Sequence, residues 1–330
     1  MNQKTLLAKS NGRERTVFCS RGIRVSKLLT WFLILATLPA VISAQDYKYY
    51  TNNGAIVISV CYRCTGTIIV PAEIDGLPVV RLGSDSFRNC GYLSSITIPD
   101  SVTSIGASVF VSCRSLTNVM LSSNITNIGN GAFSTCTSLT KIQLPDSVTS
   151  VGSGVFMYCE SLSDVQLSSR LTNINQLMFQ NCSSLTNITI PDSVISIGLN
   201  AFKGCTNLQS VYFKGNAPTI TFEVFGYDDD ATVYYLPGTT GWNSTFSSRP
   251  AVLWNPQART GDASFGVVAN QFGFNLTGTS GLNIVVEACE DLAHPVWTPV
   301  GTNTLAGGAS YFSDSNWAEH PARFYRLRSP

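Results

Sequence analysis

The chain has 330 residues, of which 44% are hydrophobic and 12% are charged, well below the charged share of about 25% in ordinary globular proteins. This composition excludes an intrinsically disordered chain, which needs low hydrophobicity and high net charge. Residues 1–44 hold seven basic side chains and one acidic side chain, so the rest of the chain has 14 basic and 19 acidic side chains and a net charge of −5. An acidic remainder argues against a nucleic-acid-binding protein, because such domains carry a basic surface.

Residues 1–44 have the organisation of a secretory signal peptide. A basic region is followed by an apolar run at 28–42, and the small residue Ala44 then precedes a polar segment. The run is shorter than the ~20 residues that span a bilayer, and Pro39 interrupts it. We therefore expect cleavage after Ala44 and no stable membrane span in the mature protein; a single membrane anchor is the alternative.

Residues 45–78 are predicted to form an N-terminal cap. Asn52-Asn53-Gly54 lies between a Tyr-rich run and an Ile/Val-rich run, which predicts a β-hairpin over 47–60. A turn-rich insertion follows at Asp75-Gly76-Leu77-Pro78 and separates this hairpin from a region of regular repeats.

A 23-residue period organises the segment 79–254, in which Phe, Cys and Leu recur at this spacing. A fixed period of this length indicates a solenoid. The Phe and Cys residues of the register, which we expect to be structural, are Phe87, Phe110, Phe133, Phe156, Phe179, Phe202 and Phe225, and Cys90, Cys113, Cys136, Cys159, Cys182 and Cys205.

One repeat can be interpreted physically. Ile96 and Ile98 alternate with polar residues, which predicts a short strand with one buried face, and Pro99 ends this strand because it cannot donate to a ladder. Residues 107–110 suit a helical turn that buries Phe110. One circuit cannot close its own core, so neighbouring circuits must stack. The prediction is a mainly β solenoid of about seven 23-residue units with short strands and helical turns.

The repeat Ile-Gly-x-x-x-Phe-x-x-Cys-x-x-Leu-x-x-Ile-x-Ile-Pro-x-Ser-Val resembles the bacterial BspA-like leucine-rich repeat over about residues 67–237. The sequence departs from the general leucine-rich pattern because it lacks the Asn of the turn. The resemblance implies a leucine-rich-repeat solenoid and a secreted or cell-surface protein, and families of this kind are often implicated in adhesion to host or matrix proteins.

A second, 46-residue period lies within the repeats. Pro-Asp-Ser-Val occurs at 99–102, 145–148 and 191–194, so that Asp100, Asp146 and Asp192 occupy alternate units. Such a row is interpreted as a solvated edge; a cation-binding row is the alternative, although hard cations need several oxygen ligands within ~2.6 Å. The acidic run 228–230 lacks the Glu that an EF-hand loop requires, so no metal site is predicted.

Outside the expected signal peptide, which contains Cys19, the cysteines fall into three groups. The six in the register lie about 4.8 Å apart along the stack with parallel side chains, a Cβ spacing too long for disulfides, so we expect buried, reduced thiols. Cys61 and Cys64 form a Cys-x-x-Cys pair, for which a structural disulfide or a free pair is favoured over a redox centre because no βαβ unit surrounds it. A zinc site there needs two further ligands. Cys289 has no assignment.

Residues 255–330 have the pattern of a small all-β domain. Short apolar runs separated by Gly, Asn and Pro predict a β-sandwich-like fold. The tail, with 310–314 and 323–327, is similar to a terminal domain found on exported bacterial proteins, which implies a sorting or attachment role. His294 and His320 lie beside Pro without a nucleophile–base motif, so we expect surface positions. No catalytic residue and no cofactor is predicted.

The outward positions of the repeat strands are the candidate binding surface. They form two rows of mostly neutral hydrogen-bonding side chains on a regular sheet face, the kind of surface that solenoids use for partners. The alternative is that these polar residues simply keep the strand face soluble. The candidate ligand-binding residues are Asn118, Lys141, Gln143, Asp164, Gln166, Asn187, Thr189 and Tyr212.

The leading functional hypothesis is a non-catalytic secreted or cell-surface protein that binds an extracellular protein or glycan, and not nucleic acid, through its solenoid face. One rival is a structural envelope spacer that attaches through the C-terminal domain. A weaker rival is an extracellular carbohydrate-active enzyme. The identity of the ligand and the oligomeric state stay open at the level of sequence.

Overall fold

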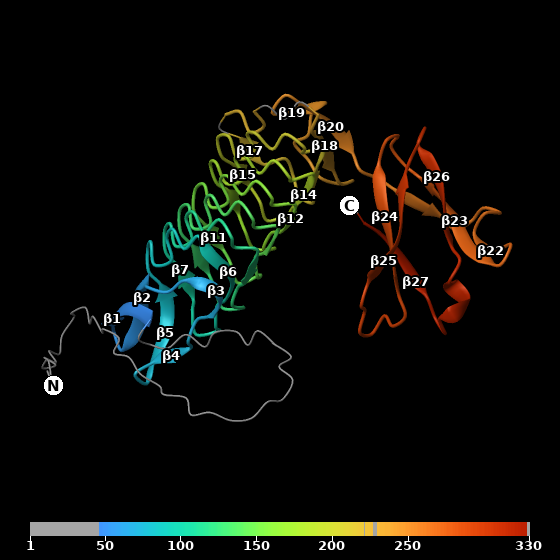
Figure 1. The fold of residues 1–330 in the computed structure, drawn as a ribbon. Helices are drawn as coiled ribbons and strands as arrows, with labels where there is room; N and C mark the ends of the chain where they lie inside the picture. The colour runs from blue at the N-terminus through green and yellow to red at the C-terminus, as the bar shows by residue number, and fades with distance from the viewer. Residues whose placement is uncertain (1–45, 221, 227–229, 329–330) are drawn as a thin grey trace, which may run out of the picture. The chain divides into compact units, whose positions relative to one another are not determined.

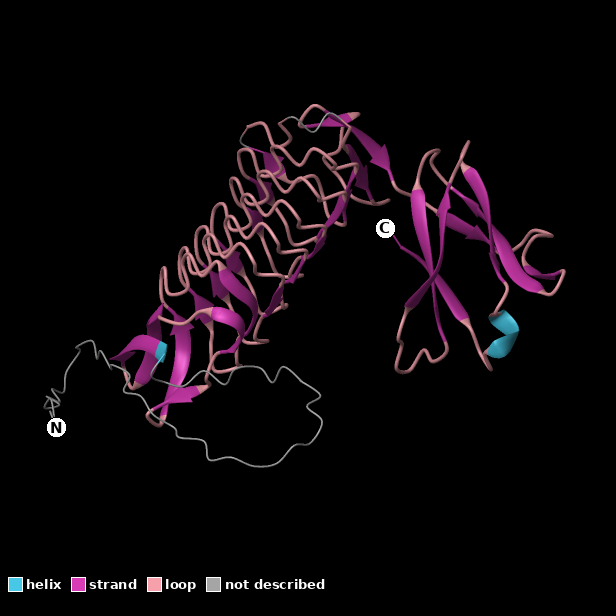
Figure 2. Cartoon of the chain, in the orientation of Figure 1, coloured by secondary structure: helices cyan, strands magenta, loops and turns pink. Residues whose placement is uncertain are grey.

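The computed structural model describes residues 46–220, 222–226 and 230–328, so the expected signal peptide and Asp228-Asp229 lie outside the described residues. The chain divides into two compact units, and strands and turns make up nearly all of both, with a short 3-10 helix at Trp317–Glu319 in the second (Figures 1 and 2). The described part contains no α-helix. The first unit comprises 46–186, 193–208 and 219–226, and the second comprises 187–192, 209–218 and 230–328.

The first unit opens with the hairpin that the sequence predicts. Strands β1 (Tyr47–Asn52) and β2 (Ala55–Cys61) pair antiparallel around Asn53 and Gly54, whose φ angles of 49° and 77° are both left-handed. Asn and Gly are the residues that adopt this conformation most readily, so the pair makes a tight hairpin turn. The turn-rich insertion is a second hairpin, in which β4 (Glu73–Ile74) pairs with β5 (Leu77–Leu82).

Two series of short parallel strands run through the stacked repeats (Figure 1). Paired residues occupy equivalent positions of consecutive repeats, as in the pairing of Ile142 with Val165, so the sequence period is also the strand register. The first series in this unit is β3 (Thr65–Ile69), β6 (Tyr92–Thr97), β8 (Asn118–Met120), β10 (Lys141–Gln143) and β12 (Asp164–Gln166). The second series is β7 (Ser104–Ile105), β9 (Asn127–Ile128), β11 (Ser150–Val151), β13 (Asn173–Ile174), β15 (Ser196–Ile197) and β17 (Thr219–Ile220).

The segment that carries each Phe is a turn bonded to the next repeat rather than the helical turn that the sequence suggests. The backbone N–H groups of Ser108, Phe110 and Ser112 donate to carbonyl oxygens of the next repeat, at 2.7–2.9 Å. Ser108 and Ser112 have φ angles of 56° and 60°, and left-handed residues four positions apart do not fit a helix. The turn therefore combines hydrogen bonds to the next repeat with bonds inside itself, from the Val111 N–H to the Ser108 carbonyl oxygen at 3.3 Å and from the Cys113 N–H to the Phe110 carbonyl oxygen at 3.1 Å.

The seven Phe rings of the register form one continuous column inside the solenoid. All are completely buried, and the centroids of successive rings lie 5.1–5.7 Å apart. At the N-terminal end Tyr47 packs edge-on against Phe87, with 6.1 Å between ring centroids. The hairpin of the cap thus closes the column with an aromatic ring of its own.

The second unit contains a parallel sheet followed by a small sandwich. In the sandwich, two antiparallel sheets share a core that includes Phe274, Leu276, Ile284, Val286 and Phe312, which confirms the predicted β-sandwich-like fold. The boundary after residue 254 stays a prediction.

The parallel sheet contains β14 (Asn187–Ile190), β16 (Ser210–Phe213), β18 (Thr232–Tyr235) and β20 (Arg249–Leu253), with β19 (Thr245–Phe246) antiparallel to β20. The sandwich sheets are β21 (Gln257–Arg259), β22 (Gly266–Val268), β23 (Gln271–Thr277) and β26 (Ala309–Asp314), and β24 (Asn283–Cys289), β25 (Thr298–Thr304) and β27 (Phe324–Arg328).

Candidate functional site

The outward side chains of three successive strands, β8, β10 and β12, form an exposed surface that we call the open strand face. Between them lie inward residues such as Ile142, which is only 1% exposed, so the alternation of an ordinary strand holds. The residues of the open strand face are Asn118, Met120, Lys141, Gln143, Asp164 and Gln166.

The parallel register brings the polar groups of this face together in pairs. Lys141 lies opposite Asp164, and its Nζ is 2.7 Å from the Asp164 Oδ2, while Gln143 lies opposite Gln166. Both members of the ion pair are more than half exposed, and such surface pairs contribute little to stability. The face therefore offers a partner both charges, together with amides that donate and accept hydrogen bonds.

The face does not continue into the second unit, contrary to the sequence prediction. Asn187 and Thr189 are half-buried, and Tyr212 is only 5% exposed. The Tyr212 ring stacks on Tyr234 at 5.0 Å and meets the edge of Trp254 at 6.4 Å. Burial raises the pKa of Tyr212 to about 12. The prediction of an exposed aromatic at Tyr212 is therefore wrong, because strands beyond the 23-residue register add aromatic side chains that cover it.

Two large exposed side chains, one on the open strand face and one on the strand beside it, are apolar. Tyr92 on β6 is 81% exposed and Met120 on the neighbouring β8 is 57% exposed, and the two strands pair directly. The sequence contains an indication that Tyr92 is exposed, because the equivalent positions of the next two repeats are the polar residues Ser115 and Ser138. A partner on this face thus meets apolar as well as polar contacts.

The aspartates of the 46-residue period join the repeats in pairs. The Asp146 Oδ1 accepts hydrogen bonds from the backbone N–H of Ser169 at 2.9 Å and from its hydroxyl at 2.8 Å. Asp100 and Ser123 make the same two contacts at 3.3 Å. The acidic turn therefore binds the Ser turn of the next repeat, which favours the solvated-edge interpretation and explains why the two types of turn alternate.

The Asp146 contact predicts a dependence of stability on acid. The backbone N–H and then the hydroxyl of Ser169 lower the pKa of the exposed Asp146 below its ordinary value. A carboxylate whose pKa is lowered by folding stabilises the protein above its unfolded pKa of about 4, and this stability is lost as the pH falls through the lower folded value. In thermal melts from pH 6 to pH 2, we expect Asp146→Ala to lose less stability than the native chain over that range. Asp192→Ala is the control, because in the described part of the chain its carboxylate accepts no hydrogen bond from Gly215, which stands at the equivalent of Ser169; equal acid slopes in all three proteins refute the assignment.

Five of the six repeat cysteines are completely buried small side chains with a hydrogen-bonded thiol. The Cys136 thiol, for example, donates to the carbonyl oxygen of Phe110 at 3.2 Å. Equivalent contacts to the Phe of the preceding repeat are made by Cys113, Cys159, Cys182 and Cys205. Cys90 differs, because it is half-buried.

These buried thiols are expected to be unreactive in the folded protein. Burial raises the pKa of Cys159 to about 12 and that of Cys136 and Cys182 above the ordinary value, so almost no nucleophilic thiolate exists at pH 8. Alkylation with iodoacetamide followed by peptide mass mapping should label these three only after denaturation. Labelling of any of them in the native protein at the denatured rate contradicts this packing.

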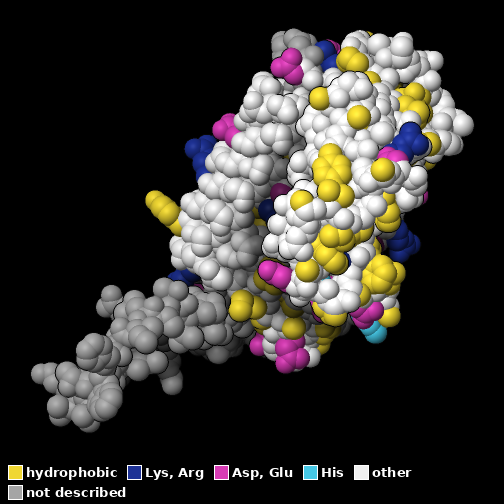
Figure 3. All heavy atoms as spheres, turned by 90° about the vertical axis from the view of Figure 1, so that its right-hand side faces the viewer, with side chains coloured by type: hydrophobic (Ala, Val, Ile, Leu, Met, Phe, Trp, Pro, Cys, Tyr) yellow, Lys and Arg dark blue, Asp and Glu magenta, His cyan; other side chains and the backbone are white. Residues whose placement is uncertain are grey.

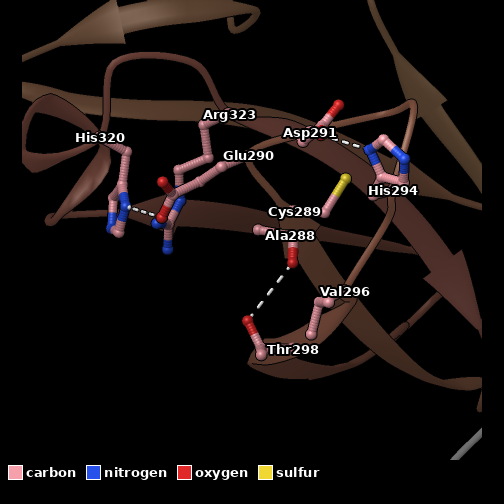
Figure 4. A pocket seen from close by; sticks show the side chains of 9 residues that line it. All are labelled: Ala288, Cys289, Glu290, Asp291, His294, Val296, Thr298, His320 and Arg323. Atoms are coloured by element: carbon pink, nitrogen blue, oxygen red, sulfur yellow. Dashed lines mark hydrogen bonds and ion pairs between the residues drawn. The ribbon is translucent and has the colours of Figure 1, made fainter.

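A cavity of about 440 Å³ lies in the second unit beside the end of β24 (Figure 4). His320 is 27% exposed, and its Nδ1 lies 2.6 Å from the Glu290 Oε1. His294 is 90% exposed, with its Nδ1 3.3 Å from the Asp291 Oδ2. Both histidines line this cavity, and His294 is the one that has the expected exposed surface position. The buried Cys289 is also in this wall, which gives it a place but no assigned role.

The described residues contain neither a metal-binding group nor a membrane-spanning helix. Within the described ranges, no group of three or more His, Cys, Asp or Glu side chains is arranged to hold a metal ion. No helix in the same part of the chain is long and apolar enough to cross a membrane.

Comparison with known proteins finds similarity in the repeats. A family model described as the BspA type leucine rich repeat region matches in six copies, at residues 80–209 and 126–240. The crystal structure of the leucine-rich repeat protein TpLRR from T. pallidum has 29% sequence identity and a TM-score of 0.52, over 57% of this chain and 90% of that one. A leucine-rich cell surface protein from Faecalibacterium prausnitzii A2-165 has 23% identity and a TM-score of 0.43, over 66% of this chain and 73% of that one. No curated protein matches the chain.

Proposed function

Because the repeats of this chain are a BspA-type leucine-rich repeat region, we propose that it is a non-catalytic, exported protein that binds an extracellular protein or glycan through the open strand face. The observation that carries this proposal is the exposure of six outward side chains on three adjacent strands, whose inward residues are buried or half-buried. A rigid row of amides, a charge pair and one thioether can contact an extended partner over several repeats at once.

The test is a quadruple variant in which Lys141, Gln143, Asp164 and Gln166 are all changed to Ala. These residues lie on adjacent strands and point away from the core, so each change should alter the free energy of unfolding by no more than about 0.5 kcal/mol. Partners are first identified by binding the native chain to arrays of purified matrix proteins and of glycans. We expect the variant to lose at least about tenfold in affinity for them, the effect of about 1.4 kcal/mol of lost contacts.

A matched control lies outside the open strand face. Thr126 and Thr149 are exposed and adjoin the second series of strands, so Thr126→Ala with Thr149→Ala should leave binding unchanged. If the quadruple variant melts like the native chain and still binds every identified partner at full affinity, the open strand face is not the binding surface.

A second candidate function, attachment through the C-terminal domain, is favoured by its surface. Figure 3 shows hydrophobic side chains gathered on this domain, and Val267 and Val268 on the short strand β22 are 52% and 55% exposed. Val296 is 76% exposed. If the solenoid is only a spacer, replacing Val267 and Val268 by Ser should abolish attachment, whereas the quadruple variant of the open strand face should not affect it.

A further inference from the structure

Three thiols meet where the N-terminal cap joins the first repeat. Cys61 ends strand β2, Cys64 lies just before β3, and Cys90 lies just before β6. The Cys64 thiol donates to the Cys61 carbonyl oxygen at 3.2 Å, and the neighbouring thiols of Cys61 and Cys90 both raise its pKa, so the three side chains form one cluster. The sequence pairs Cys61 with Cys64 and places Cys90 in the repeat column, so the cluster emerges only from the fold.

The pairing of the strands explains why Cys64 and Cys90 are close. Strand β3 pairs in parallel with β6, with Thr65 opposite Tyr92 and Thr67 opposite Ser95. The register shifts between these two pairs, and neither pair has the regular 23-residue offset of the repeats. Cys64 and Cys90 are therefore neighbours across two strands without being equivalent members of one column.

Because of this shifted register, the geometry that prevents disulfides between the repeat cysteines does not apply to Cys64 and Cys90. Equivalent cysteines in a stack hold their side chains parallel at the strand spacing of about 4.8 Å, which is too far between Cβ atoms for a disulfide. Cys64 and Cys90 are not held in this way, because the shifted pairing of β3 with β6 places them at non-equivalent positions, and the Cys61 and Cys90 thiols both raise the pKa of Cys64. Cys113, one repeat later, directs its thiol to the carbonyl oxygen of Phe87 at 3.1 Å.

We propose that Cys64 and Cys90 form a disulfide that fastens the cap to the first repeat, with Cys61 as the adjacent free thiol. The oxidant is a disulfide donor, R–S–S–R. The half-buried Cys90 thiol gives up its proton and attacks one donor sulfur, and the departing sulfur takes up that proton to leave as the first R–SH, which gives a mixed disulfide. The Cys64 thiol then attacks the Cys90 sulfur in the same way, and its proton leaves with the second R–SH. Two protein thiols are oxidised and one donor disulfide is reduced to two thiols.

The bridge should stabilise the end of the solenoid. It closes a loop between residues 64 and 90, and this reduces the conformational freedom of the unfolded chain. The loop includes both strands of the second hairpin, β4 and β5, and Phe87, the first Phe of the buried column. The cap therefore stays attached to the column when reductant is absent.

The experiment treats the purified full chain with oxidised glutathione, blocks the remaining thiols with iodoacetamide in denaturant, and maps the peptides without reduction. We expect one cross-linked peptide pair that joins Cys64 to Cys90, with Cys61 alkylated. The midpoint of thermal unfolding should exceed that of the reduced chain by about 5 °C or more. This difference should vanish in Cys90→Ser and persist in Cys113→Ser, the matched variant one repeat later.

The peptide map of the native sequence decides the question even if a variant fails to fold. Full alkylation of Cys64 and Cys90 after oxidation overturns the proposal, and so does a bridge between Cys61 and Cys64 with Cys90 alkylated. A glutathione adduct that persists on Cys90 also refutes it, because Cys64 would then be unable to reach the mixed disulfide.

Discussion

Replacing Phe133 with Ala is expected to lower the free energy of unfolding by about 3–5 kcal/mol, the usual range for a buried Phe. Phe133 is completely buried, and its ring stacks between Phe110 at 5.1 Å and Phe156 at 5.7 Å. The change thus opens a cavity in the middle of a column and removes ring contacts on both sides. Because each repeat is stabilised by its neighbours, hydrogen exchange should become faster in the adjacent repeats as well.

Chemical denaturation of native and variant chains measures this effect. Tyr92→Ala is the matched control, because it also removes an aromatic ring, but one that is 81% exposed, and it should cost no more than about 0.5 kcal/mol. If Phe133→Ala lowers the free energy of unfolding by less than about 1 kcal/mol, the stacked Phe rings contribute little to the stability of the solenoid.

Replacing Gly129 with Ala is expected to cost about 1–3 kcal/mol, although it adds a single methyl group. A Cβ atom at this position would lie 2.5 Å from the backbone N of Ala107 and 2.6 Å from the carbonyl C of Gly106. Backbone atoms of the preceding repeat cannot rotate away as a flexible side chain can, so the two repeats must separate. The separation would strain the hydrogen bond from the Gly129 N–H to the Ile105 carbonyl oxygen, which is 2.9 Å long.

The control for this prediction is Gly91→Ala. A Cβ atom on Gly91 meets only the Asn89 carbonyl oxygen at 4.0 Å, and Gly91 has no left-handed φ, so the change should be neutral or slightly stabilising. Thermal unfolding of both variants gives the comparison. A melting temperature for Gly129→Ala at or above that of Gly91→Ala would show that the repeats can separate without cost.

Features that depend on the period alone could be predicted from the sequence. The spacing of Phe and Ile positions predicts the strand register and the buried column, and Asn53-Gly54 predicts the hairpin through its own backbone preference. The form of the turn around Phe110 could not be predicted in the same way. Alternate N–H groups of this turn donate to the next repeat, and local sequence does not distinguish such a turn from a short helix.

In the candidate site, contacts inside the regular repeats could be predicted from the sequence, whereas contacts with residues outside them could not. Lys141 and Asp164 could be placed side by side because both lie inside the regular repeats. The burial of Tyr212 could not be predicted, because it depends on Trp254, which lies beyond the last 23-residue repeat. The neighbourhood of Cys64 and Cys90 depends in a similar way on an insertion that shifts the register.

The paired arrangement of the repeats has a consequence for how the length of such a protein can change during evolution. Strand β6 pairs with β8 and strand β10 with β12, and Asp100 and Asp146 each bind the Ser turn within the same pair. Deletion of residues 101–146 would join Asp100 to a segment in which Ser169 replaces Ser123 and every buried column keeps its register. Unequal recombination in 46-residue steps therefore produces shorter or longer proteins that retain each kind of contact, whereas a 23-residue step places two turns of the same kind next to each other.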